Sequence, residues 1–336
     1  MGFGAGQTLS KYVLVTGGAG YIGAHACKAL AAAGYVPVAF DNLSTGWRDA
    51  VKFGPLVQGD LLDRSDLDGA FAKYKPVAVL HFAALALVGE ASQNPGHYWR
   101  VNVGGSLNLI EAAIAADVKK IVFSSTCAVY GNPDGMHLDE ETPQHPINAY
   151  GASKRAIEDM LANFGESHGL SHVIFRYFNV AGADPDGELG EQHRPETHLI
   201  PLMLETIAGA RPNLTVYGAD YATRDGTCIR DYVHVMDLVG AHVLGLQWLL
   251  NERENRTFNL GTGRGFSVRE VIDHARGVTN RAIKVTTGTR RAGDAAALVS
   301  GSERARVELG WTPDRSTLPL MIADAWKWHQ RPGFAG

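Results

Sequence analysis

Cysteine is scarce in this 336-residue sequence, and the three that it holds, Cys27, Cys127 and Cys228, lie far apart. Three scattered thiols supply neither a disulfide framework nor the paired spacing of a zinc site, so we expect no bound metal. Long apolar runs are missing too, because none approaches the roughly 20 residues that a membrane span needs. The first ten residues lack the basic and then apolar pattern of a secretory signal, and we therefore expect a cytoplasmic protein.

An excess of positive charge is also absent, since 31 lysines and arginines stand against 35 aspartates and glutamates, for a net charge of -4. This balance argues against a general binder of nucleic acid or membrane surfaces, so an anionic ligand must be held by a few local arginines. Hydrophobic content of 45% and charge content of 20% are typical of a folded enzyme. The length allows one large domain with a smaller lobe.

A glycine-rich turn lies between an expected strand and an expected helix near the N-terminus. The strand at 12–16 runs into Gly17-Gly-Ala-Gly20-Tyr-Ile-Gly23, and an alanine-rich helix at 24–33 follows. Backbone N–H groups at such a helix start bind a pyrophosphate, because absent side chains let the phosphate approach the positive end of the helix dipole. The next strand, at 35–40, ends in Asp41, where a carboxylate can bind the adenosine ribose. An acid there repels a 2′-phosphate, so the pattern predicts NAD rather than NADP.

Further short strands end in residues that suit a ligand site. Asp60 follows a strand at 56–58, Ala83 and Ala84 follow one at 77–82, and Thr126 follows one at 121–125. In an open parallel sheet, ligands collect outside the carboxyl ends of the strands. The alternation of strands and helices therefore predicts a doubly wound, parallel, Rossmann-type α/β sheet with its site along this edge. We expect His81, within one of these strands, to be a satisfied core residue.

Tyr150 and Lys154 lie four residues apart in Asn148-Ala-Tyr-Gly-Ala-Ser-Lys154, at the start of a helical run. This spacing puts both side chains on one face of a helix. A lysine beside a phenol favours the phenolate, so we expect the pKa of Tyr150 to fall below its ordinary value of about 10 and the phenolate to act as a base. The hydroxyl of Thr126 can bind the same substrate oxygen. The competing interpretation of this pair is a solvated helix face.

Taken together, these motifs resemble the extended short-chain dehydrogenase/reductase superfamily. Two later runs, Arg176-Tyr-Phe-Asn179-Val-Ala-Gly-Ala and Gly226-Thr-Cys-Ile-Arg230-Asp-Tyr-Val-His-Val-Met-Asp237, narrow the resemblance to the UDP-glucose 4-epimerase family. The resemblance extends from about residue 12 to 328. It implies NAD-dependent inversion of C4 of a UDP-sugar, interconverting UDP-galactose and UDP-glucose through a transient 4-keto sugar. The NAD is expected to be tightly bound and not consumed.

The resemblance also implies roles for individual residues. Catalysis falls to Tyr150, Lys154 and Thr126. The cofactor contacts fall to Gly17, Gly20, Tyr21, Ile22, Gly23, Asp41, Asn42, Asp60, Leu61, Phe82, Ala83, Ala84, Tyr150, Lys154 and Phe178, to which we add Asn102 and Ser124 as nearby polar residues. The UDP-sugar contacts fall to Thr126, Asn179, His198, Leu199, Tyr217, Arg230, Arg291 and Asp294. Of these, Arg230 and Arg291 are the expected clamp for the diphosphate.

The sequence departs from the family pattern in the substrate pocket and near the cofactor. Leu298 is intermediate between a tyrosine, which restricts the pocket to hexoses without an N-acetyl group, and smaller residues, which admit N-acetylated sugars. UDP-N-acetylglucosamine and UDP-xylose therefore stay as alternative substrates. Ala86 stands where relatives often have a polar cofactor contact. A different class of function, a non-catalytic NAD-sensing regulator, also remains, although such relatives usually lose the tyrosine or the lysine.

The second half of the chain leaves the simple alternation of strands and helices. We expect residues 1–182, with returning segments near 226–261, to form the NAD-binding Rossmann-type domain. Residues 183–336 are expected to form mainly a smaller C-terminal α/β lobe that binds the substrate. The family resemblance implies a homodimer. Apolar faces at 103–115 and 157–164 are suited either to a two-fold interface or to burial within one chain.

Overall fold

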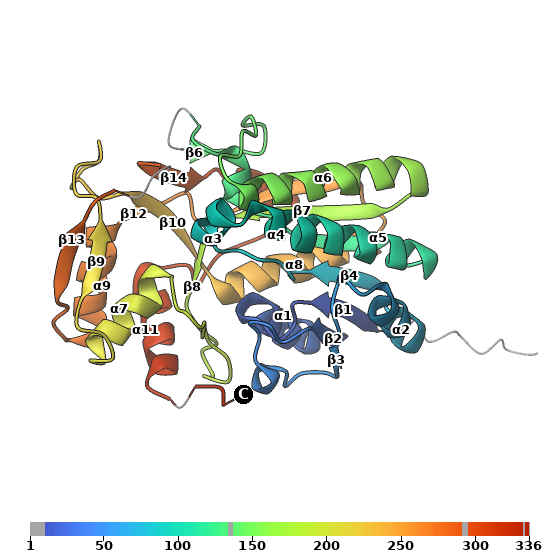
Figure 1. The fold of residues 1–336 in the computed structure, drawn as a ribbon, viewed down its shortest axis with the longest axis horizontal. Coiled ribbons are helices and arrows are strands. Elements are labelled where there is room, and N and C mark those ends of the chain that lie inside the picture. Colours follow the sequence, from blue (N-terminus) through green and yellow to red (C-terminus); the bar gives the residue numbers. More distant parts are fainter. Residues whose placement is uncertain (1–10, 134–136, 291–294, 332, 336) are drawn as a thin grey trace, which may run out of the picture.

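The strand expected at 12–16 is β1 (Tyr12–Thr16) in the computed structural model of the chain, which describes residues 11–133, 137–290, 295–331 and 333–335 (Figure 1). It lies inside a seven-stranded sheet of order β11-β7-β5-β4-β1-β2-β3. Every neighbouring pair in this sheet is parallel. The other strands are β2 (Val36–Asp41), β3 (Leu56–Gln58), β4 (Ala78–His81), β5 (Lys120–Ser124), β7 (Ser171–Tyr177) and β11 (Arg256–Leu260).

Helices cover both faces of this sheet, because successive strand residues point to opposite sides. On one face, Val13 and Val15 belong to a core shared with α1 (Tyr21–Ala32) and α8 (Val235–Leu250). On the other face, Leu14 belongs to a core shared with the helices α2 (Arg64–Tyr74), α5 (Gly105–Ala115) and α6 (Ala149–His168). Parallel sheets buried on both faces are the doubly wound class, so the predicted fold class is confirmed.

The segment with the expected apolar face at 103–115 is a regular α-helix only from Gly105. A π-helical turn, Trp99–Gly104, precedes it and keeps Asn102 inside, with 1% of that residue exposed. The remaining short elements of this part are α3 (Val88–Gln93), α4 (Pro95–Tyr98) and the 3-10 turns η1 (Arg48–Ala50) and η3 (Cys127–Tyr130). Among the described residues, no helix combines the length and apolarity needed to cross a membrane.

A second group of elements lies beside the large sheet, at the left of Figure 1. Its main sheet has the order β12-β10-β14-β6, with β8 paired to β10, and β13 pairs with β9 in a separate two-stranded sheet. The helices α7, α9 and α11 share one core with these strands. The bounds are β6 (His137–Leu138), β8 (Asn179–Ala181), α7 (Leu199–Ile207), β9 (Leu214–Tyr217), β10 (Ile229–His234), β12 (Gly265–Ser267), α9 (Val268–Thr279), β13 (Val285–Gly288), β14 (Ala297–Ser300) and α11 (Leu318–His329). The short helix α10 (Glu303–Glu308) packs instead with the core of the large sheet through Ala305.

The chain passes between the two groups several times. β10 belongs to the second sheet, whereas α8 packs under the large sheet and β11 joins its edge. The short strand β6, from the first half of the chain, pairs in parallel with β14, from the last eighth. These crossings place the carboxyl ends of the large sheet next to the second group, and the division near residue 182 stays a prediction.

Candidate active site

The glycine turn between β1 and α1 has the shape that close approach of a ligand requires. A Cβ added at Gly23 would lie 2.1 Å from the carbonyl oxygen of Gly17, and one added at Gly17, whose φ is +71°, would lie 2.7 Å from the amide nitrogen of Ala83. Gly20 is the N-cap of α1, so the first helical N–H groups have no capping side chain from that residue. The turn therefore fits the pyrophosphate of a dinucleotide.

Asp41, Asn42 and Asp60 lie together beside this turn. Asp41 Oδ2 accepts a hydrogen bond from the amide of Ala19 at 3.0 Å, and Oδ1 accepts one from the amide of Leu43 at 2.8 Å. Burial raises the pKa of the Asp41 carboxyl above its ordinary value, and the two backbone bonds offset part of that effect. Asn42 Nδ2 donates to Asp60 Oδ2 at 3.0 Å. Asp41 thus fixes the turn itself, besides standing where a ribose carboxylate is expected.

Four predicted cofactor residues have mainly structural contacts. Leu61 is 7% exposed and lies in the core against α5, and Ile22 packs against the core on the opposite face. The Tyr21 hydroxyl donates to the carbonyl oxygen of Gly182 at 2.7 Å, which joins α1 to the second group. The ring of Phe82 lies 4.7 Å from the ring of His242. Direct contacts of these residues with a cofactor stay predictions.

Polar side chains from neighbouring elements hydrogen-bond the last residue of β4. His81 is 3% exposed, and its ring nitrogens hydrogen-bond Thr16 Oγ1 at 2.7 Å and Ser106 Oγ at 2.8 Å. Burial lowers the pKa of His81 to about 3, so the ring is neutral, and the predicted core role is confirmed. Ala83 and Ala84 follow this strand as expected, with Ala83 against the glycine turn.

Asn102 and Ser124 hold the site together from the protein side. Asn102 Oδ1 accepts from the amide of Leu85 at 2.8 Å, and its Nδ2 donates to Ser153 Oγ on α6 at 3.0 Å. Ser124, the last residue of β5, hydrogen-bonds the hydroxyl of Tyr177. Both side chains are therefore satisfied by protein groups, and their predicted cofactor contacts stay untested.

Tyr150 and Lys154 lie one turn apart at the start of α6, as the spacing predicts. Asn148 caps this helix by accepting a hydrogen bond from the amide of Gly151 at 2.9 Å, so Tyr150 is the second helical residue. Lys154 is 3% exposed, and its Nζ donates to the carbonyl oxygen of Ser124 at 2.8 Å. Thr126 is buried at the end of β5 and hydrogen-bonds the Tyr150 side chain. The three predicted catalytic residues are therefore in one place.

The electrostatics of this trio differ from the sequence-based expectation. Burial raises the pKa of Tyr150 above its ordinary value, and the hydrogen bond with Thr126 lowers it only in part. Burial also lowers the pKa of Lys154 to about 7, while the charge of Glu158 raises it. The prediction that Lys154 depresses the pKa of Tyr150 is wrong for the protein alone, because the lysine is desolvated and donates to a carbonyl group. Ionising the phenol needs further positive charge.

Apart from Thr126, the predicted substrate residues that the structure describes lie on the second group of elements, and Phe178, a predicted cofactor contact, directly precedes β8. Phe178 is 5% exposed and packs in one cluster with Leu298, and Arg230 on β10 is in register with Leu298 on β14. Exposed Asn179 is on β8, which also pairs with β10. The remaining positions are His198, the N-cap of α7, Leu199, its first residue, and Tyr217, which ends β9 and is 43% exposed. Arg291 and Asp294 lie outside the described residues.

Sequence reasoning missed two polar clusters near these residues. Glu158, four residues after Lys154, pairs with Arg176 at 2.6 Å. Its helical spacing from Lys154 was a signal that could have identified it. Glu191, His193 and Glu196 gather around His198, and their alternation of carboxylates with histidines was a second such signal.

Comparisons with known proteins agree with this geometry. The model of the NAD dependent epimerase/dehydratase family matches residues 13–261. The UDP-glucose 4-epimerase of Rhizobium meliloti (strain 1021) is 48% identical over 96% of this chain and 98% of the relative. The crystal structure of UDP-glucose 4-epimerase from Brucella ovis in complex with NAD is 48% identical, with a TM-score of 0.92 over 94% of this chain and 97% of that one. The UDP-glucose 4-epimerase from Stenotrophomonas maltophila with bound NAD and formylated UDP-arabinopyranose is 38% identical, with a TM-score of 0.91 over 95% and 98%.

Proposed function

The chain belongs to the NAD-dependent epimerase/dehydratase family, and we propose that it inverts C4 of a UDP-sugar, interconverting UDP-galactose and UDP-glucose with a resident NAD. The observation that carries the proposal is the meeting of Tyr150, Lys154 and Thr126 at the end of β5, on the sheet edge that also carries the glycine turn. The named relatives act on UDP-glucose, and the solved ones hold NAD.

The roles of the chain's own residues follow from their positions. Bound NAD supplies a hydride acceptor and positive charge. Tyr150 takes the proton of the C4 hydroxyl, and Thr126 holds the same oxygen and orients it. Lys154, whose Nζ donates to the Ser124 carbonyl oxygen, is held on the same face of α6 as Tyr150. The same phenol returns the proton after the opposite face of the 4-keto sugar has been presented, so the net reaction is an inversion with no net oxidation.

The second group of elements is the proposed holder of the nucleotide. Arg230 provides a planar guanidinium for the diphosphate, with Arg291 as its predicted second arm. Binding energy placed on the UDP, away from C4, allows the sugar to turn without release of the substrate. In this proposal residues 183–336 form mainly the substrate lobe, while α8, β11 and α10 pack with the large sheet.

The direct test is turnover of UDP-galactose by purified protein with no added NAD. We expect UDP-glucose to form, and we expect Tyr150→Phe to lower kcat by about 10²–10⁴-fold, as the loss of a general base does. Bound NAD, released by denaturation and assayed, should be unchanged in this variant. Tyr74→Phe, at the last residue of α2, is the matched control and should keep full activity. Protein that retains NAD without any turnover would instead support the regulator alternative.

The preferred sugar is a separate question for the same assay. Leu298 packs against the cluster that contains Phe178, so its volume borders the proposed sugar site. We propose UDP-galactose and UDP-glucose as the principal pair, with UDP-N-acetylglucosamine and UDP-xylose as the alternatives. Turnover numbers on UDP-galactose, UDP-N-acetylgalactosamine and UDP-xylose decide among the three.

A cytoplasmic homodimer completes the proposal and rests on the family resemblance. The apolar residues of α5 and α6 are largely used inside the chain, since Leu109, Ile157 and Leu161 are each at most 1% exposed. Trp99, on the neighbouring π-helical turn, is 44% exposed and is available to a partner. Sedimentation equilibrium tests the dimer, and a purely monomeric chain would refute it.

A further inference from the structure

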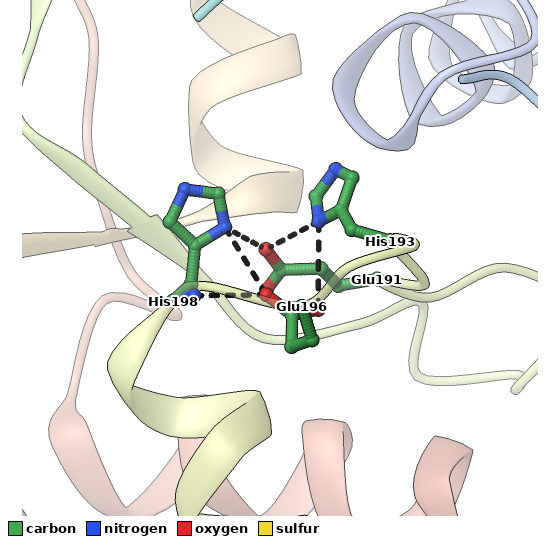
Figure 2. Close-up of side chains that lie close together, drawn as sticks. All are labelled: Glu191, His193, Glu196 and His198. Carbon is green, nitrogen blue, oxygen red and sulfur yellow. Dashed lines mark hydrogen bonds and ion pairs between the residues drawn. The ribbon is translucent and has the colours of Figure 1, made fainter. Parts of the chain in front are cut away.

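Two glutamates and two histidines on the segment that leads into α7 direct their side chains toward one another (Figure 2). They are Glu191, His193, Glu196 and His198, and one potential ligand atom from each lies within 4.8 Å of all the others. We call this set the histidine–glutamate cluster. Nothing in the proposed epimerisation uses Glu191, His193 or Glu196.

The distances inside the cluster are close to those around a small cation. His193 Nδ1 lies 3.4 Å from Glu191 Oε1 and 3.5 Å from Glu196 Oε2. A tetrahedral zinc ion with bonds of about 2.0–2.2 Å separates its ligand atoms by roughly 3.3–3.6 Å. His198 Nδ1 lies only 2.6 Å from Glu191 Oε1, so this one contact must open when an ion enters.

His193 is the sharpest indication that the cluster faces a common point. Its Nδ1 is closed to solvent and forms ion-pair contacts with Glu191 Oε1 at 3.4 Å and Glu196 Oε2 at 3.5 Å, neither of which has the geometry of an ordinary hydrogen bond. The nitrogen therefore points between the two carboxylates rather than at either one. Both separations exceed the roughly 2.7–3.2 Å of an ordinary N–H···O hydrogen bond, and an ion bound between the three atoms fits these distances.

The carboxylates are fixed in place and lack a basic side chain of their own. Glu196 Oε1 accepts hydrogen bonds from the amides of Thr197 at 2.7 Å and His198 at 2.8 Å. The side chains of Glu191 and Glu196 are 7% and 5% exposed. Arg194, between them in sequence, stacks on Trp47 with 4.5 Å to the ring centroid. Within the described part of the chain, neither glutamate forms an ion pair with a lysine or arginine.

A second acidic group nearby shows the contrasting arrangement. Asp184, Asp186 and Glu188 also converge, but Lys28 Nζ sits among them at 2.7, 2.8 and 2.7 Å. That group carries its cation within the protein. In the histidine–glutamate cluster, imidazole nitrogens rather than a lysine ammonium lie beside the carboxylates. Neutral imidazole nitrogens are metal ligands.

We propose that Glu191, His193, Glu196 and His198 bind one divalent first-row transition ion, of which zinc is the probe. Two carboxylates and two neutral imidazoles balance a charge of +2, and this nitrogen and oxygen set suits zinc, manganese, iron, cobalt and nickel rather than calcium or magnesium. Protein side chains occupy all four coordination positions of the ion and leave none for a substrate or water. The proposed role of the ion is therefore structural. The ion would link the residues of the 191–198 segment to one another just before α7. None of its ligands is a cysteine, whereas the expectation of no metal was based on cysteines alone.

The test is a metal titration of the tag-free full chain after dialysis against a chelator. We expect calorimetry with zinc chloride to give one ion per chain, and anomalous scattering at the zinc edge to place it between His193 and Glu196. Glu191→Gln and His193→Gln should each weaken binding by more than the roughly 10–100-fold that loss of a second-sphere partner causes. Asp186→Asn and Glu188→Gln are the matched controls, because Lys28 already neutralises that group.

The outcomes separate this proposal from the proposed epimerase activity, because no substrate is present. Binding of cobalt or manganese but not zinc at the same four residues also supports the site. The proposal is overturned if wild-type protein binds none of these ions at 1:1, or if the Glu191→Gln/His193→Gln double variant binds zinc as tightly as wild type. Circular dichroism identifies a variant that fails to fold, and in that case the wild-type titration and the anomalous peak decide.

Discussion

Arg176 and Glu158 form an ion pair that is closed to solvent, with 2.6 Å between Nη2 and Oε2 and 6% exposure of each side chain. The pair joins β7 to α6, one turn beyond Lys154. Glu158 Oε1 also accepts a hydrogen bond from Ser125 Oγ at 2.5 Å, and Arg176 Nη1 donates to the Tyr130 hydroxyl at 3.1 Å. The helix that carries the proposed base is thereby fixed to the strand end that carries Thr126.

Removing one member of this pair should destabilise the fold. Glu158→Gln leaves the Arg176 guanidinium buried without its carboxylate, and we expect a loss of about 3–5 kcal/mol in the free energy of unfolding. Urea denaturation followed by fluorescence measures it. Adding Arg176→Met to Glu158→Gln should restore part of the loss, and the exposed Glu166→Gln on the same helix should change it by no more than about 0.5 kcal/mol. Equal effects of Glu158→Gln and Glu166→Gln would contradict the account.

Lys154 should make stability depend on pH in a known direction. Because burial lowers its folded pKa to about 7 from an ordinary 10.5, the unfolded chain binds more protons between these two values. The penalty for burying the ammonium is therefore fully present below pH 7 and disappears as the pH rises toward 10.5. Relative to Lys154→Met, ligand-free wild type should gain stability over this window, by at most about 1.4 kcal/mol per pH unit. A difference that stays flat from pH 7 to 9.5 would show that the lysine is not desolvated.

Gly23→Ala should abolish cofactor retention. The added Cβ would lie 2.1 Å from the Gly17 carbonyl oxygen, so the turn must open and its N–H groups must move. The measurement is NAD content per chain after purification, and we expect it to fall close to zero. Gly69→Ala, in the middle of α2 with nothing within 4 Å of the new Cβ, is the matched control. It should retain NAD and gain up to about 1 kcal/mol of stability.

Thr126→Val should lower kcat and shift its pH dependence. The hydrogen bond from Thr126 lowers the pKa of Tyr150, so its loss raises that pKa and moves the ascending limb of the kcat profile to higher pH. We expect a decrease in kcat of about 10²–10³-fold at neutral pH, as found for the loss of one oriented donor. Thr126→Ser keeps the hydroxyl and should stay near wild type. If the ascending limb of the kcat profile stayed at the same pH in Thr126→Val, Thr126 would have no part in the ionisation of Tyr150.

The strands, the glycine turn and the pairing of Tyr150 with Lys154 were predictable because each depends on local chemistry. β1 begins and ends where its apolar run does, and α6 begins after the Asn148 cap. The π-helical turn before Gly105 was not predictable, since the segment 99–103 carries no proline or glycine, and Gly104 and Gly105 stand only where the turn ends.

Long-range contacts account for the rest. The ordinary spacing rule suggested a Tyr150 pKa lowered by Lys154, but the carbonyl group that binds this lysine belongs to Ser124 on β5, far from the helix in sequence. Asp41 was predicted from its distance to Gly17, yet the amide bonds from Ala19 and Leu43 that define its orientation follow only from the folded turn. Spacing identifies which residues meet. It does not determine which of their atoms are already used.

The pairing of β6 with β14 has a consequence for biosynthesis. Leu138 leaves the ribosome long before Ser300, its partner in register, has been translated. The nascent chain must hold this edge strand unpaired until synthesis is almost finished, because contacts of such sequence separation form late. The two halves of the gene are therefore poor candidates for exchange between homologues as separate cassettes, since each half leaves the other's sheet incomplete.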